Sequence, residues 1–225
     1  MTATFTVLGG RLILEDTPPR PTEDPLWLTA TVPPLAPGSR VLDCGCGSGI
    51  AALSLLLRQP LIRAEALDIN PACTALAQRN AALNQLPLIT HTADILTQPG
   101  LGPYHAILCN PPFHGQERGH TTPNPTKTQA HSLPEGDLTR WLTALMPLLH
   151  PQGTLHLILH SACEPELTTF AHTHNHPLTL TPLQTAATKP PKRLLAYLKA
   201  TSPHHLNQEN PIPAYRTDIR TRHLT

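Results

Sequence analysis

The sequence predicts an α/β domain with a mostly parallel sheet, and two observations support this fold class. Short apolar runs at residues 40–42, 63–67, 88–92 and 106–109 alternate with segments of helical character, which is typical of strands joined by crossover helices. Glycines, carboxylates or an asparagine follow these runs, as they do where parallel strands end and ligands bind. With 225 residues, of which 40% are hydrophobic, the chain is long enough for one well-buried domain.

In chain order, Arg40–Leu42 is the first predicted strand of this sheet, and a glycine-rich loop follows it. The next strand, Arg63–Leu67, leads to a helix with Asn70 as its predicted cap and Pro71 at the first helical position, where proline costs no hydrogen bond. Two further predicted strands complete this half of the sheet: Leu88–Thr92 and Ala106–Cys109.

The second half of the chain begins with a helix predicted over Asp137–Leu149. Its apolar residues recur at helical spacing and are Leu138, Trp141, Leu142, Leu145 and Leu149. The sequence His150-Pro151-Gln152-Gly153 then ends the helix and opens a strand over Thr154–Leu159. Two short strands, Leu178–Leu180 and Leu194–Leu198, are predicted after it.

The loop after the first strand reads Asp43-Cys44-Gly45-Cys46-Gly47-Ser48-Gly49. Its G-x-G-x-G spacing differs from the G-x-G-x-x-G that cradles a pyrophosphate, and no Lys-Ser/Thr follows it, which excludes a P-loop. Glycines at 45, 47 and 49 leave a backbone surface without Cβ atoms, onto which a ribose and an amino acid can press closely. Asp43 brings a carboxylate toward a positively charged ligand amine.

Two more acids follow the next two strands. Asp68 lies at the tip of its strand, 23 residues after Gly45, where a carboxylate can accept both hydroxyls of a ribose. After the third strand come Asp94 and Ile95, a carboxylate and an apolar side chain that could flank an adenine ring. Each acid alone could be a helix cap or a solvated charge, but their joint placement with the glycine loop favours a nucleoside ligand.

The sequence Asn110-Pro111-Pro112-Phe113 follows the fourth strand. The side-chain carbonyl of Asn110 and the peptide carbonyl of Pro111 can accept the two N–H groups of an amino nitrogen and direct its lone pair at an electrophile. Consecutive prolines fix φ and remove two donors, which makes such a loop rigid, and Phe113 can stack on a planar ring. An ordinary proline turn is the alternative in a chain with 27 prolines.

Together these motifs resemble the class I S-adenosylmethionine-dependent methyltransferases, on the matches at Asp43, Gly45, Gly47, Gly49, Asp68 and Asp94. The resemblance implies a Rossmann-like fold: a mostly parallel seven-stranded sheet with helices on both faces and an antiparallel strand near the C-terminus. It also implies S-adenosylmethionine as cofactor, bound by these residues together with Ile69, Ile95 and Asn110, and leaves a dehydrogenase as the weaker reading. Asn110 to Phe113 resemble the [ND]-P-P-[FY] signature of amino-methyltransferases, which makes them the expected catalytic residues.

The remainder of the chain resembles the bacterial tRNA (adenine-N6)-methyltransferases that modify valine tRNA beside its anticodon. The similar stretches are Leu8–Leu12 as an opening strand, Phe113-His114-Gly115 and the loop after it, and Ala187–Lys199 with Lys192 and Arg193 as the penultimate strand. The resemblance implies an N-terminal extension over 1–30 that contributes to substrate binding, a methyltransferase domain over 31–200 and a basic tail over 201–225.

One stretch departs from this family. Where the family has a Gln, then Gly-aromatic-basic, then an Asp, the chain has Glu15-Asp16-Thr17-Pro18-Pro19-Arg20 and then Asp24. Arg20 keeps the basic position. The departure permits an RNA- or nucleotide-binding protein of the same fold without turnover. Two further alternatives to tRNA adenine N6 share the Asn-Pro-Pro-Phe motif: guanine N2 of small-subunit rRNA and glutamine N5 of a protein.

The charge is unevenly distributed. Residues 185–225 hold seven Lys/Arg and two Asp/Glu, whereas residues 1–184 hold nine and thirteen. A basic C-terminal part suits phosphate contacts, although basic tails are often only solvated. We therefore expect tRNA as the partner, with Arg20, His114, Lys192 and Arg193 as RNA contacts.

Other observations exclude classes of protein. No apolar stretch approaches 18 residues and no basic-then-apolar leader is present, so we expect neither a membrane span nor secretion. Five scattered cysteines suit reduced thiols in the cytoplasm. The C-x-C in the glycine loop lacks a second pair, and the 14 histidines show no metal-ligand spacing, so no metal is expected.

Overall fold

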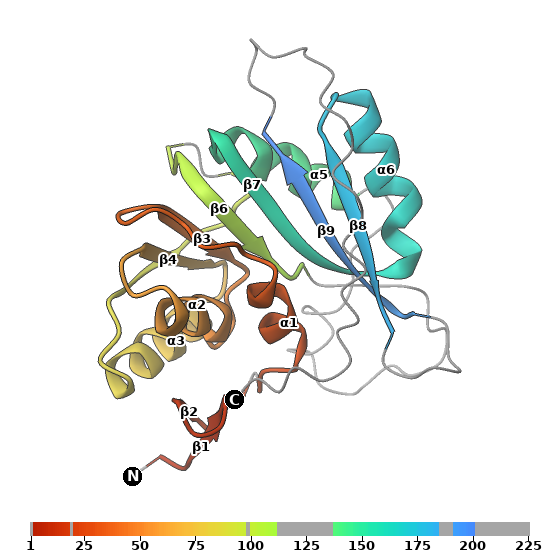
Figure 1. The fold of residues 1–225 in the computed structure, drawn as a ribbon. Helices are drawn as coiled ribbons and strands as arrows, with labels where there is room; N and C mark the ends of the chain where they lie inside the picture. The colour runs from red at the N-terminus through yellow and green to blue at the C-terminus, as the bar shows by residue number, and fades with distance from the viewer. Residues whose placement is uncertain (1, 19, 98–99, 112–136, 185–190, 201–225) are drawn as a thin grey trace.

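A computed structural model of the chain describes residues 2–18, 20–97, 100–111, 137–184 and 191–200 (Figure 1). Its strands are β1 Thr4–Val7, β2 Leu12–Glu15, β3 Arg40–Cys44, β4 Arg63–Asp68, β5 Leu88–Thr92, β6 Tyr104–Cys109, β7 Leu149–His160, β8 Leu178–Leu183 and β9 Arg193–Lys199. Its α-helices are α1 Asp24–Ala30, α2 Ile50–Arg58, α3 Pro71–Leu83, α5 Asp137–Leu145 and α6 Glu164–Thr173.

The central sheet has seven strands in the order β5-β4-β3-β6-β7-β9-β8. The first five of these strands are parallel to one another, and β9 runs antiparallel to both β7 and β8. The predicted fold class, including the antiparallel strand near the C-terminus, is therefore confirmed. The predicted strands are present as well, with β6 and β7 each beginning earlier than expected.

Helices cover the sheet on both faces, and each face has its own apolar core. On one face, Leu28 of α1, most of α2 and two alanines of α3 pack with Val41 and other inward residues of the sheet. On the other face, Leu142 of α5 and Phe170 of α6 pack with alternate residues of β3, β6 and β7. This division follows from the strand period of two, which sends successive side chains to opposite faces.

The N-terminal residues form a separate two-stranded hairpin of β1 and β2, seen below α2 and α3 in Figure 1. Leu12 and Leu14 of β2 have no exposed surface and belong to the same core as α2 and α3. The predicted opening strand over Leu8–Leu12 is wrong, because residues 8–11 form the hairpin turn. Leu8, Gly9 and Gly10 all have positive φ, a conformation that ends strand pairing.

The helix predicted over Asp137–Leu149 is shorter than expected. It ends at Leu145, a 3₁₀ turn occupies Met146–Leu148, and Leu149 already pairs with Tyr104 as the start of β7. Pro147 explains the break, since proline in a helix lacks the amide hydrogen and clashes with the preceding turn. The sequence periodicity carried the helix four residues too far because Leu149 also fits a helical face.

Within the described ranges, no helix is long and apolar enough to cross a membrane, and no group of three or more His, Cys, Asp or Glu side chains could hold a metal ion.

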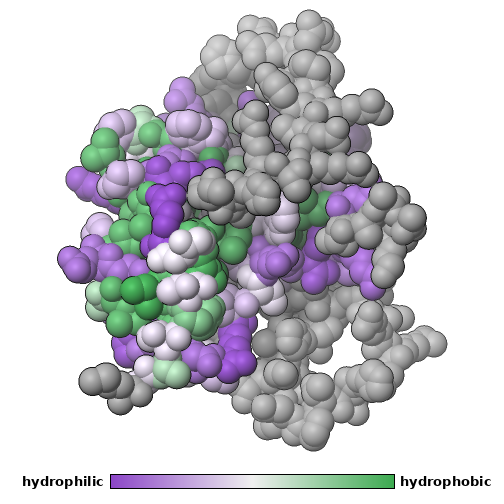
Figure 2. All heavy atoms as spheres, turned by 60° about the horizontal axis from the view of Figure 1, so that its bottom comes forward, coloured by the Kyte–Doolittle hydropathy of each residue, from purple (hydrophilic) through white to green (hydrophobic). Residues whose placement is uncertain are grey.

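The underside of the molecule is shown in Figure 2, where an apolar patch on the described surface is bordered by hydrophilic residues.

Truncation of the hairpin core should show that the hairpin is part of the folded domain. Leu14→Ala removes a fully buried side chain and should lower the free energy of unfolding by about 2–4 kcal/mol. Its neighbour Ile13 is 37% exposed, so Ile13→Ala should cost less than about 1 kcal/mol. Chemical denaturation of both variants measures the difference, and equal small losses would show that the hairpin is only loosely attached.

Candidate active site

The register of three neighbouring strands brings the motifs together at one edge of the sheet. Cys44 of β3 pairs with Leu67 of β4 on one side and with Cys109 of β6 on the other. The residues that follow these three, Gly45, Asp68 and Asn110, therefore lie next to one another at the carboxyl ends of parallel strands. This is the edge at which ligands bind in open α/β sheets.

The glycine loop follows β3 in a conformation that requires glycine. Gly45, Gly47 and Gly49 have φ of +74°, +52° and +77°, values that other residues rarely adopt. A Cβ on Gly49 would also lie 2.8 Å from the Cβ of Ala77, because α2 begins against α3 there. The spacing in the sequence identified these three glycines. The structure shows in addition that Gly49 permits α2 to pack closely against α3.

The predicted acids are oriented by backbone amides. Asp68 accepts from the amide of Gly47 at 2.9 Å with one oxygen and from that of Asn70 at 2.9 Å with the other. Asp43 accepts from the amide of Ala52 in the first turn of α2 at 3.0 Å. Asp94 accepts from the amide of Leu96 at 2.9 Å, an Asx-turn.

In the described part of the chain, none of these three carboxylates forms an ion pair with a basic side chain. Asp43 is 4% exposed, and burial, opposed by the Ala52 amide and aided by the charge of Asp68, raises its pKa to about 7. Hydrogen bonds from backbone amides hold Asp68 and Asp94 in place, and no basic side chain of the described residues neutralises them. The edge therefore suits a ligand that carries positive charge.

Asp43, expected to contact a ligand amine, makes a contact within the domain. Its carboxylate lies beneath the glycine loop, where it binds the start of α2. An acid at the N-terminus of a helix is favoured by the helix dipole. The position of Asp43 thus fits support of the loop, and direct ligand contact remains a prediction.

Apolar groups complete the edge. Ile69, directly after Asp68, is 67% exposed, whereas Ile95 is 5% exposed and belongs to the core. An exposed isoleucine beside a polar loop can contact a planar ligand surface, and Ile69 is more accessible for this contact than Ile95. Both assignments remain predictions from the sequence.

Trp141 of α5 lies against the glycine loop and was not predicted as a site residue. Its indole is 3.8 Å from the point that a Cβ on Gly45 would occupy, and Gly45 itself is exposed. Trp141 is half-buried and packs against the core under α5. Its helical spacing predicted a core role and contained no signal of this contact.

Of the expected catalytic residues, Asn110 and Pro111 are described. Asn110 follows β6 and is half-buried, and Pro111 is buried. Pro112, Phe113 and His114 lie outside the described residues, so their roles stay predictions.

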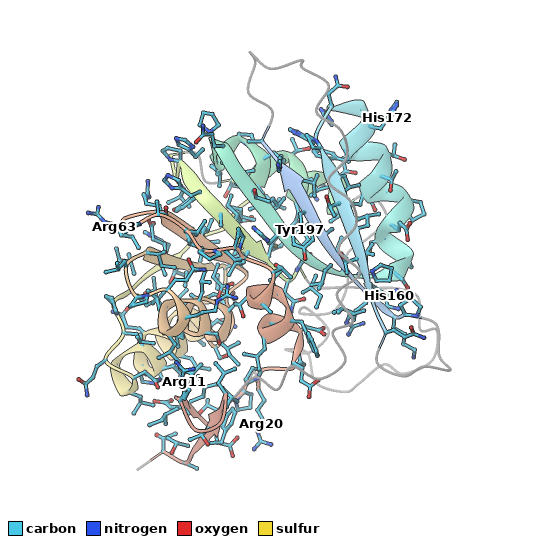
Figure 3. All side chains as sticks on the ribbon, in the orientation of Figure 1. Arg11, Arg20, Arg63, His160, His172 and Tyr197 are labelled. Atoms are coloured by element: carbon cyan, nitrogen blue, oxygen red, sulfur yellow. The ribbon has the colours of Figure 1, made fainter. Side chains whose placement is uncertain are left out.

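The arginines expected to contact RNA are paired with carboxylates. Arg20 forms an ion pair with Asp16 at 2.6 Å, and Arg193 forms one with Asp24 at 2.9 Å. Lys192 is exposed beside Arg193. Figure 3 shows Arg20 near the bottom of the molecule, His160 at the right and Arg63, at the start of β4, at the left. The RNA contacts remain predictions, and the pair to Asp24 ties β9 to the start of α1.

Comparison with known families agrees with this geometry. Residues 27–132 match the family of the methyltransferase small domain, and this range includes the glycine loop, Asp68, Asp94 and Asn110. The matched family, the order of the motifs and the fold make the chain similar to one class of protein, the S-adenosylmethionine-dependent methyltransferases. S-adenosylmethionine, the expected cofactor, is the cofactor of this class.

Curated relatives match part of the chain. The chain is 39% identical over 82 residues to the "Ribosomal RNA small subunit methyltransferase C" of Shewanella sediminis, a match that covers 36% of the chain and 24% of that protein. The protein of the same name from Shewanella denitrificans is 36% identical over 99 residues, covering 44% and 28%. The matches thus span about a quarter of these longer relatives.

Solved structures confirm the fold. A predicted O-methyltransferase of Agrobacterium tumefaciens aligns with a TM-score of 0.60 at 17% identity, covering 80% of this chain and 81% of that one. A precorrin-6y C5,15-methyltransferase of Geobacter metallireducens aligns with a TM-score of 0.58 at 14% identity, covering 84% and 94%. At these identities the likeness establishes the fold alone.

The buried Asp43 should make stability depend on pH. Its pKa of about 7 in the folded chain exceeds the value of ~4 for an unfolded aspartate. The contribution of Asp43 to the free energy of unfolding is therefore fully present below pH ~4 and is lost as the pH rises through about 7. Between these values the free energy of unfolding should fall relative to that of Asp43→Asn by on the order of 2–4 kcal/mol. Denaturation curves that stay parallel for both proteins would contradict this.

Trp141 should report occupancy of the edge. We expect S-adenosylhomocysteine to change the tryptophan fluorescence of the protein, because a ligand on Gly45 would alter the surroundings of the indole. The chain has two tryptophans, and Trp27 packs in the opposite core. Trp27→Phe should keep the change and Trp141→Phe should lose it, as a fluorescence titration can show. The reverse pattern would place the ligand elsewhere.

Proposed function

We propose that the protein transfers a methyl group from S-adenosylmethionine to an exocyclic amino nitrogen of a base in RNA. The observation that carries the proposal is the strand register that places Asn110 directly beside Gly45 and the glycine loop. The cofactor would lie on the glycines, with its ribose at Asp68 and its adenine between Ile69 and the Asp94 loop. The acceptor group would then meet Asn110 at the same edge.

The residues at this edge fit such a cofactor. The glycine loop offers backbone without side chains, and Asp68 is fixed by two amides. Asp68 and Asp94, which have no basic partner among the described residues, favour a cation. S-adenosylmethionine supplies a methyl group on a sulfonium that is already a good leaving group. What the chain must add is therefore orientation, which can provide much of the rate enhancement.

Asn110 and Pro111 would orient the acceptor. An exocyclic amino group is a weak nucleophile, since its lone pair is delocalised into the ring. The side-chain carbonyl of Asn110 and the carbonyl of Pro111 would accept its two N–H groups and turn the lone pair toward the methyl group. The reacting base would be flipped out of its helix, with Phe113 as the predicted stacking partner, and the proton would leave to solvent after transfer.

The first candidate acceptor is adenine N6 of tRNA, at the anticodon-adjacent position of valine tRNA that the sequence resemblance suggests. The names of the Shewanella relatives support a second candidate, small-subunit rRNA, where guanine N2 would be the acceptor. We also propose that the segment over 1–30 and the basic tail over 201–225 take part in substrate binding. Free cysteines suit the proposed cytoplasmic location.

A direct assay distinguishes these candidates. The protein is incubated with S-adenosylmethionine carrying a labelled methyl group and with either bulk tRNA or isolated small ribosomal subunits, both from cells that lack the protein. Mass spectrometry of the nucleosides then identifies N6-methyladenosine or N2-methylguanosine. Label in a glutamine-containing protein and in neither RNA would overturn the proposal, as would binding of RNA without any transfer.

Asn110 can be tested in the same assay. Asn110→Ala removes an acceptor carbonyl and should reduce kcat by about 10² or more, because orientation acts on the transition state. Affinity for S-adenosylhomocysteine should stay within about threefold. Asn110→Asp keeps a carbonyl acceptor and should retain much more activity than the alanine variant. Unchanged turnover in Asn110→Ala would mean that the motif is only a proline turn.

A further inference from the structure

A buried asparagine of α3 joins the N-terminal hairpin to the glycine loop. The side chain of Asn80 has no exposed surface. Its Nδ2 donates to the carbonyl of Ser48 in the glycine loop at 2.9 Å, and its Oδ1 accepts from the amide of Glu15 at the end of β2 at 2.8 Å. One planar amide thus makes contact with two segments that are 33 residues apart in the sequence.

Asn84, one helical turn further along, provides a contrast. Its Oδ1 accepts from the amide of Ile13 at 2.8 Å and its Nδ2 donates to the carbonyl of the same residue at 2.6 Å. Asn84 therefore binds β2 as a neighbouring strand would, but it does not bind the loop. Arg79 adds an ion pair to Glu15 at 2.9 Å, so two residues of α3 and its C-cap hold the hairpin, and of these three Asn80 also holds the loop.

The Ser48 carbonyl is a sensitive point in the loop. Ser48 stands between Gly47 and Gly49, whose backbones have no side chain to restrict them. The Ser48 hydroxyl is buried and has no hydrogen-bond partner among the described residues, so the carbonyl is the group through which α3 fixes this peptide. On the opposite side, Asp68 holds the amide of Gly47.

We propose that Asn80 is a positioning residue for the cofactor loop, and that the N-terminal hairpin influences cofactor binding through it. With the hairpin docked, the Glu15 amide fixes the orientation of the Asn80 side chain, and this orientation keeps the Nδ2 donor on Ser48. The inference rests on the proposed cofactor site. It adds that the hairpin belongs functionally to that site although it lies outside the central sheet.

The test compares Asn80→Ala with Asn84→Ala. Both variants lose hydrogen bonds to the hairpin, but only Asn80→Ala releases the glycine loop. We expect Asn80→Ala to weaken binding of S-adenosylhomocysteine by about tenfold, the effect of one lost hydrogen bond to a buried partner, with Asn84→Ala within about twofold of wild type. Calorimetry on samples with a cooperative unfolding transition measures the affinity.

Hydrogen exchange of the ligand-free protein gives a second readout that needs no cofactor. Peptides covering residues 42–50 should exchange faster in Asn80→Ala than in Asn84→Ala, while those covering β2 should exchange faster in both. Asn80→Asp keeps an acceptor for the Glu15 amide and lacks the donor for Ser48, so it should resemble Asn80→Ala at the loop. Arg79→Ala and Asn84→Ala loosen the hairpin and keep the bond from Asn80 to Ser48, so both should raise loop exchange slightly above that of the wild type, and this readout serves if neither Asn80 variant folds.

The outcomes separate the inference from the proposed function. A wild-type protein that does not bind S-adenosylhomocysteine would overturn the proposed cofactor site, whereas faster loop exchange in Asn80→Ala would still support the positioning role. Equal affinity and equal loop exchange in Asn80→Ala and Asn84→Ala would overturn the inference while leaving cofactor binding intact. Unchanged loop exchange in Arg79→Ala would do the same if no Asn80 variant folds.

Discussion

The hydrogen bond from the Gly47 amide to Asp68 is the interaction on which the candidate site depends. It forms because Cys44 and Leu67 are paired at the ends of β3 and β4, so that the glycine loop and the Asp68 side chain meet one residue beyond the ladder. A shift of this register by one residue would turn Asp68 to the other face of the sheet. The buried apolar residues of β3 and β4 oppose such a shift, since they would be exchanged between the two cores.

The carboxylates near the amino ends of the parallel strands and those at the carboxyl ends have different hydrogen-bond partners. At the amino end, buried Glu65 accepts from the guanidinium of Arg40, the ring of His91 and the hydroxyl of Tyr104. Burial alone would raise its pKa, but these donors lower it below the usual value. At the carboxyl end, Asp43 and Asp68 accept from backbone amides, and no basic side chain of the described residues pairs with them. The charge of Glu65 is thus balanced by neighbouring side chains, whereas the carboxyl end keeps negative charge that a cationic ligand can contact.

The hairpin and α3 show how a peripheral element becomes part of a site. Leu12 and Leu14 supply the apolar contact, and the amide groups of Asn80 and Asn84 replace a missing neighbouring strand for β2. Backbone groups of a strand need such partners, which explains an asparagine in the last turn of α3 and another at its C-cap. Because Asn80 shares its amide between β2 and the glycine loop, stability of the hairpin and geometry of the loop are linked.

Local sequence determined much of this protein: the parallel sheet, the glycine loop, the cap at Asn70, the acids after successive strands and the position of Asn110 after β6. Each has a signal within a few residues, because strand period, turn chemistry and capping are local. The sequence misplaced the N-terminal strand and extended one helix, as Leu8 and Leu149 fit more than one pattern. Only the tertiary structure decided that Asp43 lies beneath the loop, that Trp141 meets Gly45 and that Asn80 joins hairpin to loop. These contacts connect segments far apart in the chain, and the spacing of residues in the sequence does not predict which buried side chains will meet.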